Sequence, residues 1–400
     1  MKCKYLIAAW LCLSFLLVAC RNNDEPTPTP RASRTVLVYM AADNSLSNFA
    51  SDDLNEIKSG FGKLTNSDIH LLVYMDINSS NTAPRLIEIK QQNGQVVESV
   101  VRTYETNRNS VGVNETKEVL SDAFNAPQYQ ADSYGLVYWS HGEGWAIAPD
   151  QNTRWVGQDT GGNSNNKMNI SDFTKILQSA PHLDFLLFDA CFMASIEVAY
   201  ELRSYTDYII ASPTEIPGPG AMYDKLVPAL FTANTNVATT VAAGYYEPYA
   251  AIYTGGHPSN TNWVTGTSIV VIDTEKLNDL AATTRQLLAG HTANIPLLHQ
   301  TFDYDKRTGT WHIGYYDLAG MMRSILTDDA AYAQWEIAYA AASPYWETTP
   351  KNYSAYGGIF SMEGANGISC YIPTGYQTTN DKAYPQCAWY AAAGLESLGF

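Results

Sequence analysis

Continuous apolar runs alternate with segments of helical spacing over the first 225 residues. Runs rich in β-branched and aromatic residues lie at 35–40, 69–75, 135–139, 183–188 and 208–211. Such runs are typical of strands buried on both faces of a parallel sheet. Segments with apolar positions at helical spacing lie between them, at 48–59, 115–124, 170–179 and 193–203. The alternation predicts an α/β fold, an α/β/α sandwich around a mostly parallel sheet.

Two departures from this alternation refine the predicted fold. The segments at 86–89 and 95–104 flank Asn93-Gly94, a dipeptide that favours a β-hairpin turn. After about residue 225 helical segments dominate, at 237–246, 274–288, 315–326 and 330–342, with strand-like segments at 267–272 and 368–372. We therefore expect a core at 34–225 and a helix-rich C-terminal region at 226–400 whose strands complete the core sheet.

The first 33 residues have a different composition. Lys2 and Lys4 precede an uncharged apolar run at 5–19, which is shorter than the about 20 residues of a membrane-spanning helix. The sequence Leu-Val-Ala-Cys that ends at Cys20 resembles the lipobox of bacterial lipoproteins, in which the cysteine carries lipid. The alternative is an ordinary signal peptide followed by a chance cysteine. Residues 20–33 are polar and rich in Pro and Thr, as expected of an extended tether.

The N-terminal prediction changes the meaning of the six cysteines. Cleavage after a signal peptide at 1–19 removes Cys3 and Cys12, and Cys20 becomes the lipid anchor of an exported outer-membrane lipoprotein that faces the periplasm or the outside. Cys191, Cys370 and Cys387 then remain to fold, so at least one thiol stays free. We expect Cys370 and Cys387 to be either disulfide-bonded or buried.

Composition excludes some classes of partner. Hydrophobic residues make up 46% of the chain, which is enough for a large core. The formal net charge of -16 repels nucleic acid, so DNA or RNA binding is not expected. We expect a monomer.

A histidine and a cysteine follow directly on two of the predicted parallel strands. His141 comes after the strand at 135–139, and Cys191 comes after the strand at 183–188. The carboxyl ends of parallel strands share one edge of a sheet, where ligands bind. The predicted helix at 193–203 would favour a thiolate at Cys191, and His141 can protonate a departing amine. The backbone N–H groups of Gly142 and Cys191 could form an oxyanion hole.

Each of these residues also has a simpler interpretation. A cysteine at a strand end is often a small buried apolar residue, and a loop histidine is often a surface residue. The joint placement of the two at neighbouring strand ends favours catalysis. The chain has no Gly-x-Ser-x-Gly elbow, His-Glu-x-x-His zinc motif, phosphate loop or dinucleotide fingerprint, so other chemistries find little support.

Four segments make the chain resemble the clostripain family (C11) of cysteine peptidases, in the caspase-like clan. They are the strand and loop at 35–45, the His141-Gly142 pair, Asp189-Ala190-Cys191, and the strand end Ala211-Ser212-Pro213. The likeness covers roughly residues 34–225 well and the remainder loosely. It implies a caspase-like fold, a Cys191–His141 dyad, and cleavage of peptide bonds through an acyl-enzyme.

The resemblance also implies a substrate preference, from which this sequence departs. Family members commonly cleave after Arg or Lys, and acidic residues line the pocket for that P1 side chain. Asp189 matches one of these acids, and Ser212 belongs to the strand end that carries the likeness, so both are expected to bind substrate. Pro219 stands where a second acid is expected. Either Glu215 or Asp224 could substitute for it, and Glu215 could equally be a solvated loop charge.

The long polar stretch at 150–167 resembles the loop in which family members are cut during activation. Arg154 is the first candidate cleavage position and Lys167 the second, although an uncut flexible loop is the alternative. Some relatives use calcium, and Asp150 and Asp159 could contribute to such a site, although their spacing matches no EF-hand loop. No other cofactor or metal is expected. The rival to a peptidase is a surface lipoprotein with this fold that binds peptides or glycans without turnover.

Overall fold

The computed structural model describes residues 31–79, 81–145, 155–232, 236–376 and 378–400. The predicted signal peptide, the anchor residue Cys20 and most of the tether lie outside these residues. Among the described residues, none of the helices has the length and apolar character needed to cross a bilayer.

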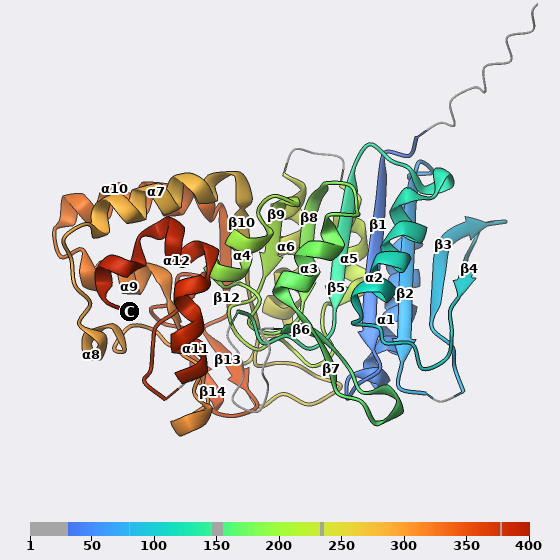
Figure 1. The fold of residues 1–400 in the computed structure, drawn as a ribbon. Coiled ribbons are helices and arrows are strands. Elements are labelled where there is room, and N and C mark those ends of the chain that lie inside the picture. The colour runs from blue at the N-terminus through green and yellow to red at the C-terminus, as the bar shows by residue number, and fades with distance from the viewer. Residues whose placement is uncertain (1–30, 80, 146–154, 233–235, 377) are drawn as a thin grey trace, which may run out of the picture. The chain divides into compact units, whose positions relative to one another are not determined.

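A mixed sheet runs through the described part of the chain (Figure 1). Its nine strands lie in the order β12-β10-β9-β8-β5-β1-β2-β3-β4. The central pairs β9–β8, β8–β5, β5–β1 and β1–β2 are parallel, and the outer pairs on both sides are antiparallel. These strands are β1 (Arg34–Ala42), β2 (Ile69–Ile77), β3 (Arg85–Gln92), β4 (Gln95–Thr103), β5 (Tyr134–Trp139), β8 (Leu183–Asp189), β9 (Thr206–Ala211), β10 (Ser268–Asp273) and β12 (Tyr345–Thr348).

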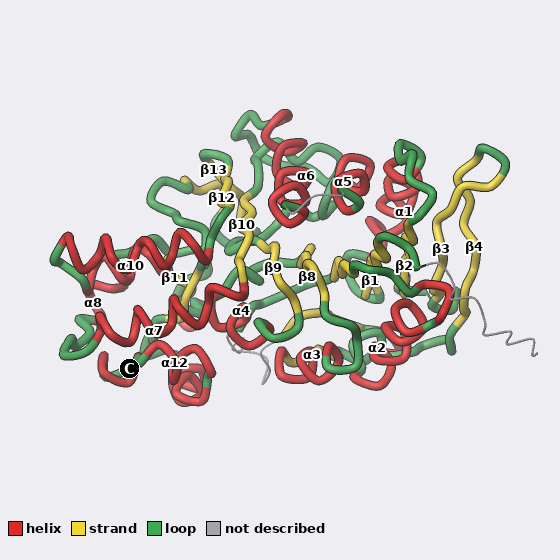
Figure 2. The backbone as a smooth tube through the Cα atoms, turned by 90° about the horizontal axis from the view of Figure 1, so that it is seen from above, coloured by secondary structure: helices red, strands yellow, loops and turns green. Residues whose placement is uncertain are grey.

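Helices cover both faces of this sheet, as Figure 2 shows in the view from above. The helices are α1 (Ser47–Phe61), α2 (Val113–Leu120), α3 (Ile170–Leu177), α4 (Ile196–Leu202), α5 (Tyr223–Leu230), α6 (Val237–Ile252), α7 (Leu277–Leu288), α8 (Ile295–Leu298), α9 (Leu318–Ile325), α10 (Asp329–Ala342), α11 (Thr378–Ala383) and α12 (Ala388–Ala393). Helices α1, α5 and α6 lie on one face, and α2, α3 and α4 lie on the other.

The alternation of side chains along β1 explains why both faces need cover. Val36 and Val38 point into the core beneath α1, α5 and α6, whereas Leu37 and Tyr39 point into the core on the opposite side. All four side chains are fully buried. Burial of each aliphatic side chain of this size contributes roughly 1.5–3 kcal/mol, so the uninterrupted apolar run is what a doubly covered strand requires.

The C-terminal region adds two strands to the sheet, one of them at the predicted position 267–272. β10 and β12 add the antiparallel edge, and β12 belongs to a segment that the sequence pattern did not identify as a strand. The predicted strand at 368–372 is β15 (Ser369–Tyr371), which pairs with β11 (Tyr315–Asp317) in a separate small sheet. β11 in turn occupies the start of a segment predicted to be helical, and α9 begins after it. β13 (Lys351–Ser354) and β14 (Gly358–Ser361) form another small sheet.

Two further predictions need correction. The polar stretch expected to be a loop contains a hairpin of β6 (Trp155–Asp159) and β7 (Asn166–Asn169). The helix after Cys191 begins at Ile196 rather than Met193, because Ser195 is the N-cap and accepts a hydrogen bond from the Val198 N–H. Cys370 and Cys387 are both buried and no disulfide joins them, which is one of the two predicted alternatives.

Candidate active site

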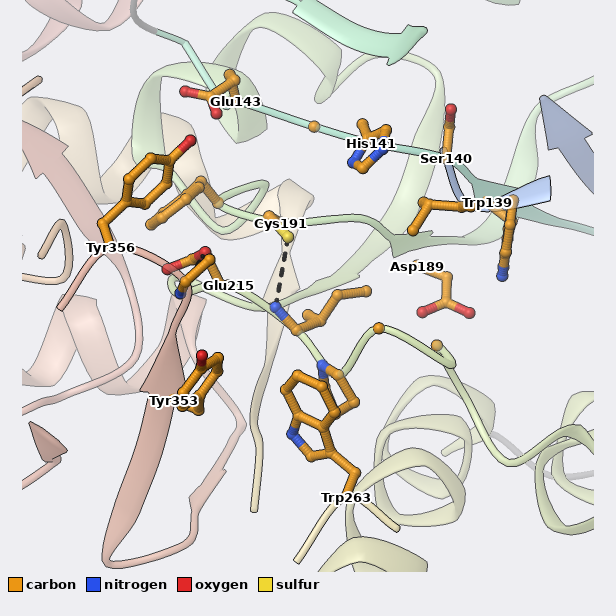
Figure 3. Close-up of a pocket in the computed structure, with 18 of the residues that line it drawn as sticks. Trp139, Ser140, His141, Glu143, Asp189, Cys191, Glu215, Trp263, Tyr353 and Tyr356 are labelled. Atoms are coloured by element: carbon orange, nitrogen blue, oxygen red, sulfur yellow. Dashed lines mark hydrogen bonds between the residues drawn. The ribbon is translucent and has the colours of Figure 1, made fainter. Parts of the chain in front are cut away.

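The register of two neighbouring strands places His141 and Cys191 side by side. Trp139 at the end of β5 pairs with Asp189 at the end of β8, and each candidate residue follows two positions later. Both residues line one cavity of about 300 Å³, together with Trp139, Glu215 and Trp263 (Figure 3). The structure thus brings together the two strand ends that the sequence singled out.

Cys191 is held as a neutral thiol rather than as a preformed thiolate. Burial raises the pKa of its thiol, and the charge of Glu215 raises the pKa further. The Ile216 N–H donates a hydrogen bond to Sγ at 3.4 Å, which Figure 3 marks, and acts in the opposite direction. The predicted contribution of a helix N-terminus to a thiolate is wrong, because α4 begins five residues beyond the cysteine.

A strained turn follows the cysteine instead of a helix. Phe192 has a φ of 60°, a left-handed conformation that is uncommon for a bulky residue. Its N–H donates to the Thr214 carbonyl at 3.0 Å, and the Ala194 N–H donates to the Ser212 carbonyl at 3.0 Å. These bonds tie the turn to the chain beyond β9, so the neighbouring strand end fixes the position of Cys191.

His141 is neutral in its surroundings. Burial lowers the pKa of its imidazole to about 4, and the charge of Lys167 contributes to this shift. Its Nε2 lies 2.8 Å from the Ser45 hydroxyl, and its carbonyl accepts a hydrogen bond from the Gly157 N–H at 2.8 Å. Ser45 was missed as a site residue, although its segment after β1 was part of the family likeness.

Gly142 lies directly against the backbone of Cys191. A Cβ atom at this position would come within 2.8 Å of the Cys191 carbonyl oxygen and 3.1 Å of the Met193 sulfur, so a larger residue would displace the turn. Gly142 lies opposite Val156 in an antiparallel bridge. The two hydrogen bonds of this bridge are made by the neighbouring residues, from the Gly157 N–H to the His141 carbonyl and from the Glu143 N–H to the Trp155 carbonyl. The Gly142 N–H therefore points away from β6, as a donor to a substrate carbonyl must.

Asp189 lies at one end of the cavity and is 1% exposed. Its carboxylate accepts hydrogen bonds from the Ala221 N–H at 3.0 Å and from the hydroxyls of Tyr223 and Tyr245, each at 2.9 Å. Burial raises its pKa, and these three donors oppose that shift. Because all three donors are neutral, they fix the orientation of the carboxylate without cancelling its charge.

Of the other residues predicted to bind substrate, Glu215 lines the cavity and Ser212 and Asp224 do not. Glu215 lines the cavity, and its Oε1 accepts a hydrogen bond from the Ala355 N–H at 3.0 Å. Ser212 does not line it: its hydroxyl is fully buried and is within hydrogen-bond distance of Thr214 and Ser268. Asp224 lies in α5 and forms ion pairs with lysines instead.

A buried ion network behind the turn was not predicted from the sequence. Arg307 contacts the Glu143 carboxylate at 2.6 Å and the Asp305 carboxylate at 2.7 Å. Its guanidinium carbon lies 5.1 Å from the centre of the Phe192 ring. Arg307 comes from the C-terminal region, more than 100 residues after the cysteine, and no motif connects the two in the sequence.

Only two of the predicted processing and calcium positions, Lys167 and Asp159, are among the described residues. Arg154 and Asp150 lie outside the described residues. Lys167 is part of β7, where its Nζ lies 3.9 Å from the centre of the Trp155 ring. Asp159 is buried at the end of β6 and accepts hydrogen bonds from the N–H and hydroxyl of Ser110.

Comparison with known proteins connects this geometry to one family. Residues 38–392 match the clostripain family, Peptidase_C11. Clostripain from Hathewaya histolytica is 26% identical in an alignment of 223 positions that covers 48% of this chain and only 41% of that protein.

Solved structures extend the similarity over nearly the whole described fold. A secreted C11 cysteine protease from Bacteroides thetaiotaomicron, solved with an irreversible peptide inhibitor, is 44% identical with a TM-score of 0.82, covering 92% of this chain and 100% of that one. An inactive zymogen of a C11 protease from Parabacteroides distasonis is 30% identical with a TM-score of 0.76, covering 91% and 99%. These matches support a peptidase hydrolase, and the chain belongs to the clostripain family of cysteine peptidases.

Proposed function

We propose that the protein is a cysteine endopeptidase in which Cys191 is the nucleophile and His141 transfers the proton. The observation that carries the proposal is the matched position of the two residues after the paired ends of β5 and β8. The raised pKa of Cys191 and the lowered pKa of His141 both favour a neutral resting pair. Activation of the thiol then accompanies attack on the substrate rather than preceding it.

The bond changes follow from this arrangement. Sγ of Cys191 bonds to the scissile carbonyl carbon, and the thiol proton passes to His141. The carbonyl oxygen takes up negative charge near the N–H groups of Gly142 and Cys191. The C–N bond breaks as His141 protonates the departing amine, and water then hydrolyses the thioester to release the acid and restore the thiol.

We further propose that the P1 side chain is basic. Asp189, Glu143 and Glu215 line the cavity, and no Lys or Arg is among its described lining residues. Glu143 is paired with Arg307, so Asp189 and Glu215 are the acids left to attract a cation. Pro219 lies outside this lining, so the proposed preference depends on Asp189 and Glu215.

The decisive experiment compares wild type with Cys191→Ala on a proteome-derived peptide mixture. We expect cleavage after Arg or Lys by the wild type and none by the variant. Hydrolysis that survives Cys191→Ala would exclude this mechanism. A wild type that neither cleaves peptides nor is labelled at Cys191 by a peptidyl electrophile would indicate a binding protein. Asp189→Asn tests specificity, and we expect it to lower kcat/KM selectively for basic P1 residues.

We propose export and lipidation at Cys20 from the sequence pattern, and the similar Bacteroides thetaiotaomicron protease is described as secreted. Incorporation of a labelled fatty acid into the full chain, compared with Cys20→Ser, tests this proposal.

For self-processing we propose Arg154 rather than Lys167, because Lys167 is in a strand paired with Gln158. Fragment masses from wild type, with Cys191→Ala as the uncut control, distinguish the two positions.

A further inference from the structure

A second cavity lies beside the catalytic one, on the other side of the loop that follows β9. It has a volume of about 510 Å³, and its lining comes from α1, α5, α6 and two loops. Trp263, which Figure 3 labels, borders both cavities. Along the segment 218–221 the two glycines line the catalytic cavity, whereas Pro219 and Ala221 line the second one. This segment is therefore the wall between the two cavities.

The second cavity is acidic. Among its described lining residues no Lys, Arg or His occurs, and the acids are Asp52, Asp53, Glu56 and Asp224. Asp224 already forms ion pairs with Lys63 and Lys225. The other three acids lie on α1, where spacings of three and four residues put side chains on one face of a helix. The cavity thus presents acidic side chains of one helix face to whatever enters it.

Asp53 is the most buried of these acids and has an oxygen without a partner. The residue is 3% exposed, and its Oδ2 has no hydrogen-bond partner among the described residues. Burial and the charges of Asp189 and Glu56 raise its pKa to about 9, and a hydrogen bond from the Trp139 indole opposes the shift. The carboxyl is therefore protonated near neutral pH. A cationic group in the cavity would stabilise its ionised form and give Oδ2 a partner.

The rest of the lining suits a long organic cation better than a metal ion. Phe49, Met222, Ile252 and Trp263 offer apolar surface beside the acids. The stems of Lys and Arg pack against such surface while their charged ends reach polar groups, and the face of a Trp ring attracts cations. The acids of this cavity are not among the described carboxylates that approach one another closely enough to share a metal ion.

We propose that the second cavity binds a second basic side chain of the peptide substrate, a Lys or Arg two residues from P1. The inference rests on the proposed function and extends its specificity. In an extended peptide, side chains two residues apart point to the same side and lie about 7 Å apart, so they can enter neighbouring cavities. Pro219, where the family likeness led us to expect an acid, lines the second cavity, and Asp53 supplies an acid there from α1 instead.

The test compares matched internally quenched peptides that all have Arg at P1. One pair carries Lys or norleucine at P3, and the other pair carries them at P2′, because norleucine keeps an apolar stem but lacks the charge. We expect wild type to show about 10-fold higher kcat/KM for Lys in one of the two pairs, and less at high salt. Equal values in both pairs, with the peptides cleaved, would overturn the second cavity and leave the peptidase function standing.

Asp53→Asn should abolish this Lys preference, because the amide cannot carry the charge. The matched control is Asp76→Asn: Asp76 is also 3% exposed with an unpartnered Oδ2, but it does not line the cavity, so the preference should persist. An unchanged preference in Asp53→Asn overturns the proposal. If that variant does not fold, Glu56→Gln replaces it, since its side-chain carbonyl can still accept the Tyr223 N–H, and the same outcome is decisive.

A binding measurement separates this inference from a failure of catalysis. Full-length Cys191→Ala is titrated with fluorescently labelled forms of the same peptides, and anisotropy reports their affinity. We expect the Lys peptide of one pair to bind about 10-fold more tightly than its norleucine partner, even if wild type hydrolyses neither. Equal affinities in both pairs, or no binding by any of the peptides, would overturn the second cavity whatever the outcome for hydrolysis.

Discussion

The loops that carry the cysteine and the histidine end neighbouring strands but are held in different ways. The Cys191 loop is bound to the segment after β9 by two backbone hydrogen bonds and is backed by the buried Arg307 network. The His141 loop is bound to β6 by two backbone hydrogen bonds, the Ser45 hydroxyl contacts the imidazole, and Glu143 of this loop is also paired with Arg307.

The difference indicates which loop a mutation can change without damaging the fold. A nucleophile needs a fixed position relative to the oxyanion donors, and dense packing with a strained turn provides it. The histidine must exchange a proton, and the group that contacts its imidazole is the Ser45 hydroxyl. We therefore expect disruption of the cysteine side to damage the fold and disruption of the histidine side to alter rates.

We expect the largest effect on activity from His141→Ala. Removal of the proton-transfer group should lower kcat by about 10³-fold, within the usual range for general acid–base catalysis. Steady-state kinetics on a basic-P1 peptide measures the loss. The variant should keep the wild-type Tm, and full activity would remove His141 from the mechanism.

Arg307→Met tests the support of the cysteine side. It leaves Glu143 and Asp305 buried without their cation, which typically costs about 3–5 kcal/mol of unfolding free energy. Denaturant unfolding measures the change. The matched surface control is Arg323→Met, because Arg323 pairs with an Asp329 side chain that is 91% exposed and should contribute little. Equal effects in the two variants would contradict the proposed support.

Ser45→Ala tests the support of the histidine side. Loss of the hydroxyl contact should lower kcat several-fold through poorer orientation of the imidazole while KM stays near its wild-type value. Ser47→Ala, at the start of α1, serves as the control, because its hydroxyl accepts a hydrogen bond from the Asn78 N–H instead of contacting the imidazole. A change confined to KM would assign Ser45 to substrate binding instead.

Lys167→Met should produce the smallest effect, a shift in pH dependence. The positive charge of Lys167 helps lower the pKa of His141, so its removal should raise that pKa. Activity requires neutral His141 in the free enzyme, so the acidic limb of kcat/KM should move to higher pH. The lowered pKa of His141 also affects stability. Between pH 6.5 and about 4 the unfolded chain binds a proton at His141 more readily than the folded chain does, so the free energy of unfolding falls as the pH drops through this range. An unchanged limb in Lys167→Met would show that the lysine does not influence the histidine.

Local pattern predicted the central parallel strands and the two strand ends after which His141 and Cys191 lie. Doubly buried strands have a distinctive composition, and parallel strands place their carboxyl ends together, so His141 and Cys191 could be paired from the sequence. Arg307 could not be found this way, because only the tertiary fold brings it behind Phe192. Ser212 was misjudged for a related reason: its strand end is correct, but the side chain points into a buried hydroxyl cluster.

The pairing of Trp139 with Asp189 has a consequence for dynamics. Because each member of the proposed dyad follows this pair by two residues, the backbone ladder between β5 and β8 sets their separation. Amides in such a fully buried central ladder open only with global unfolding. Hydrogen exchange should therefore be slowest at 135–139 and 185–189, and much faster in the hairpin of β3 and β4 at the sheet edge. Motions that admit and release substrate would then bend the surrounding loops while the distance between the two reacting groups is preserved.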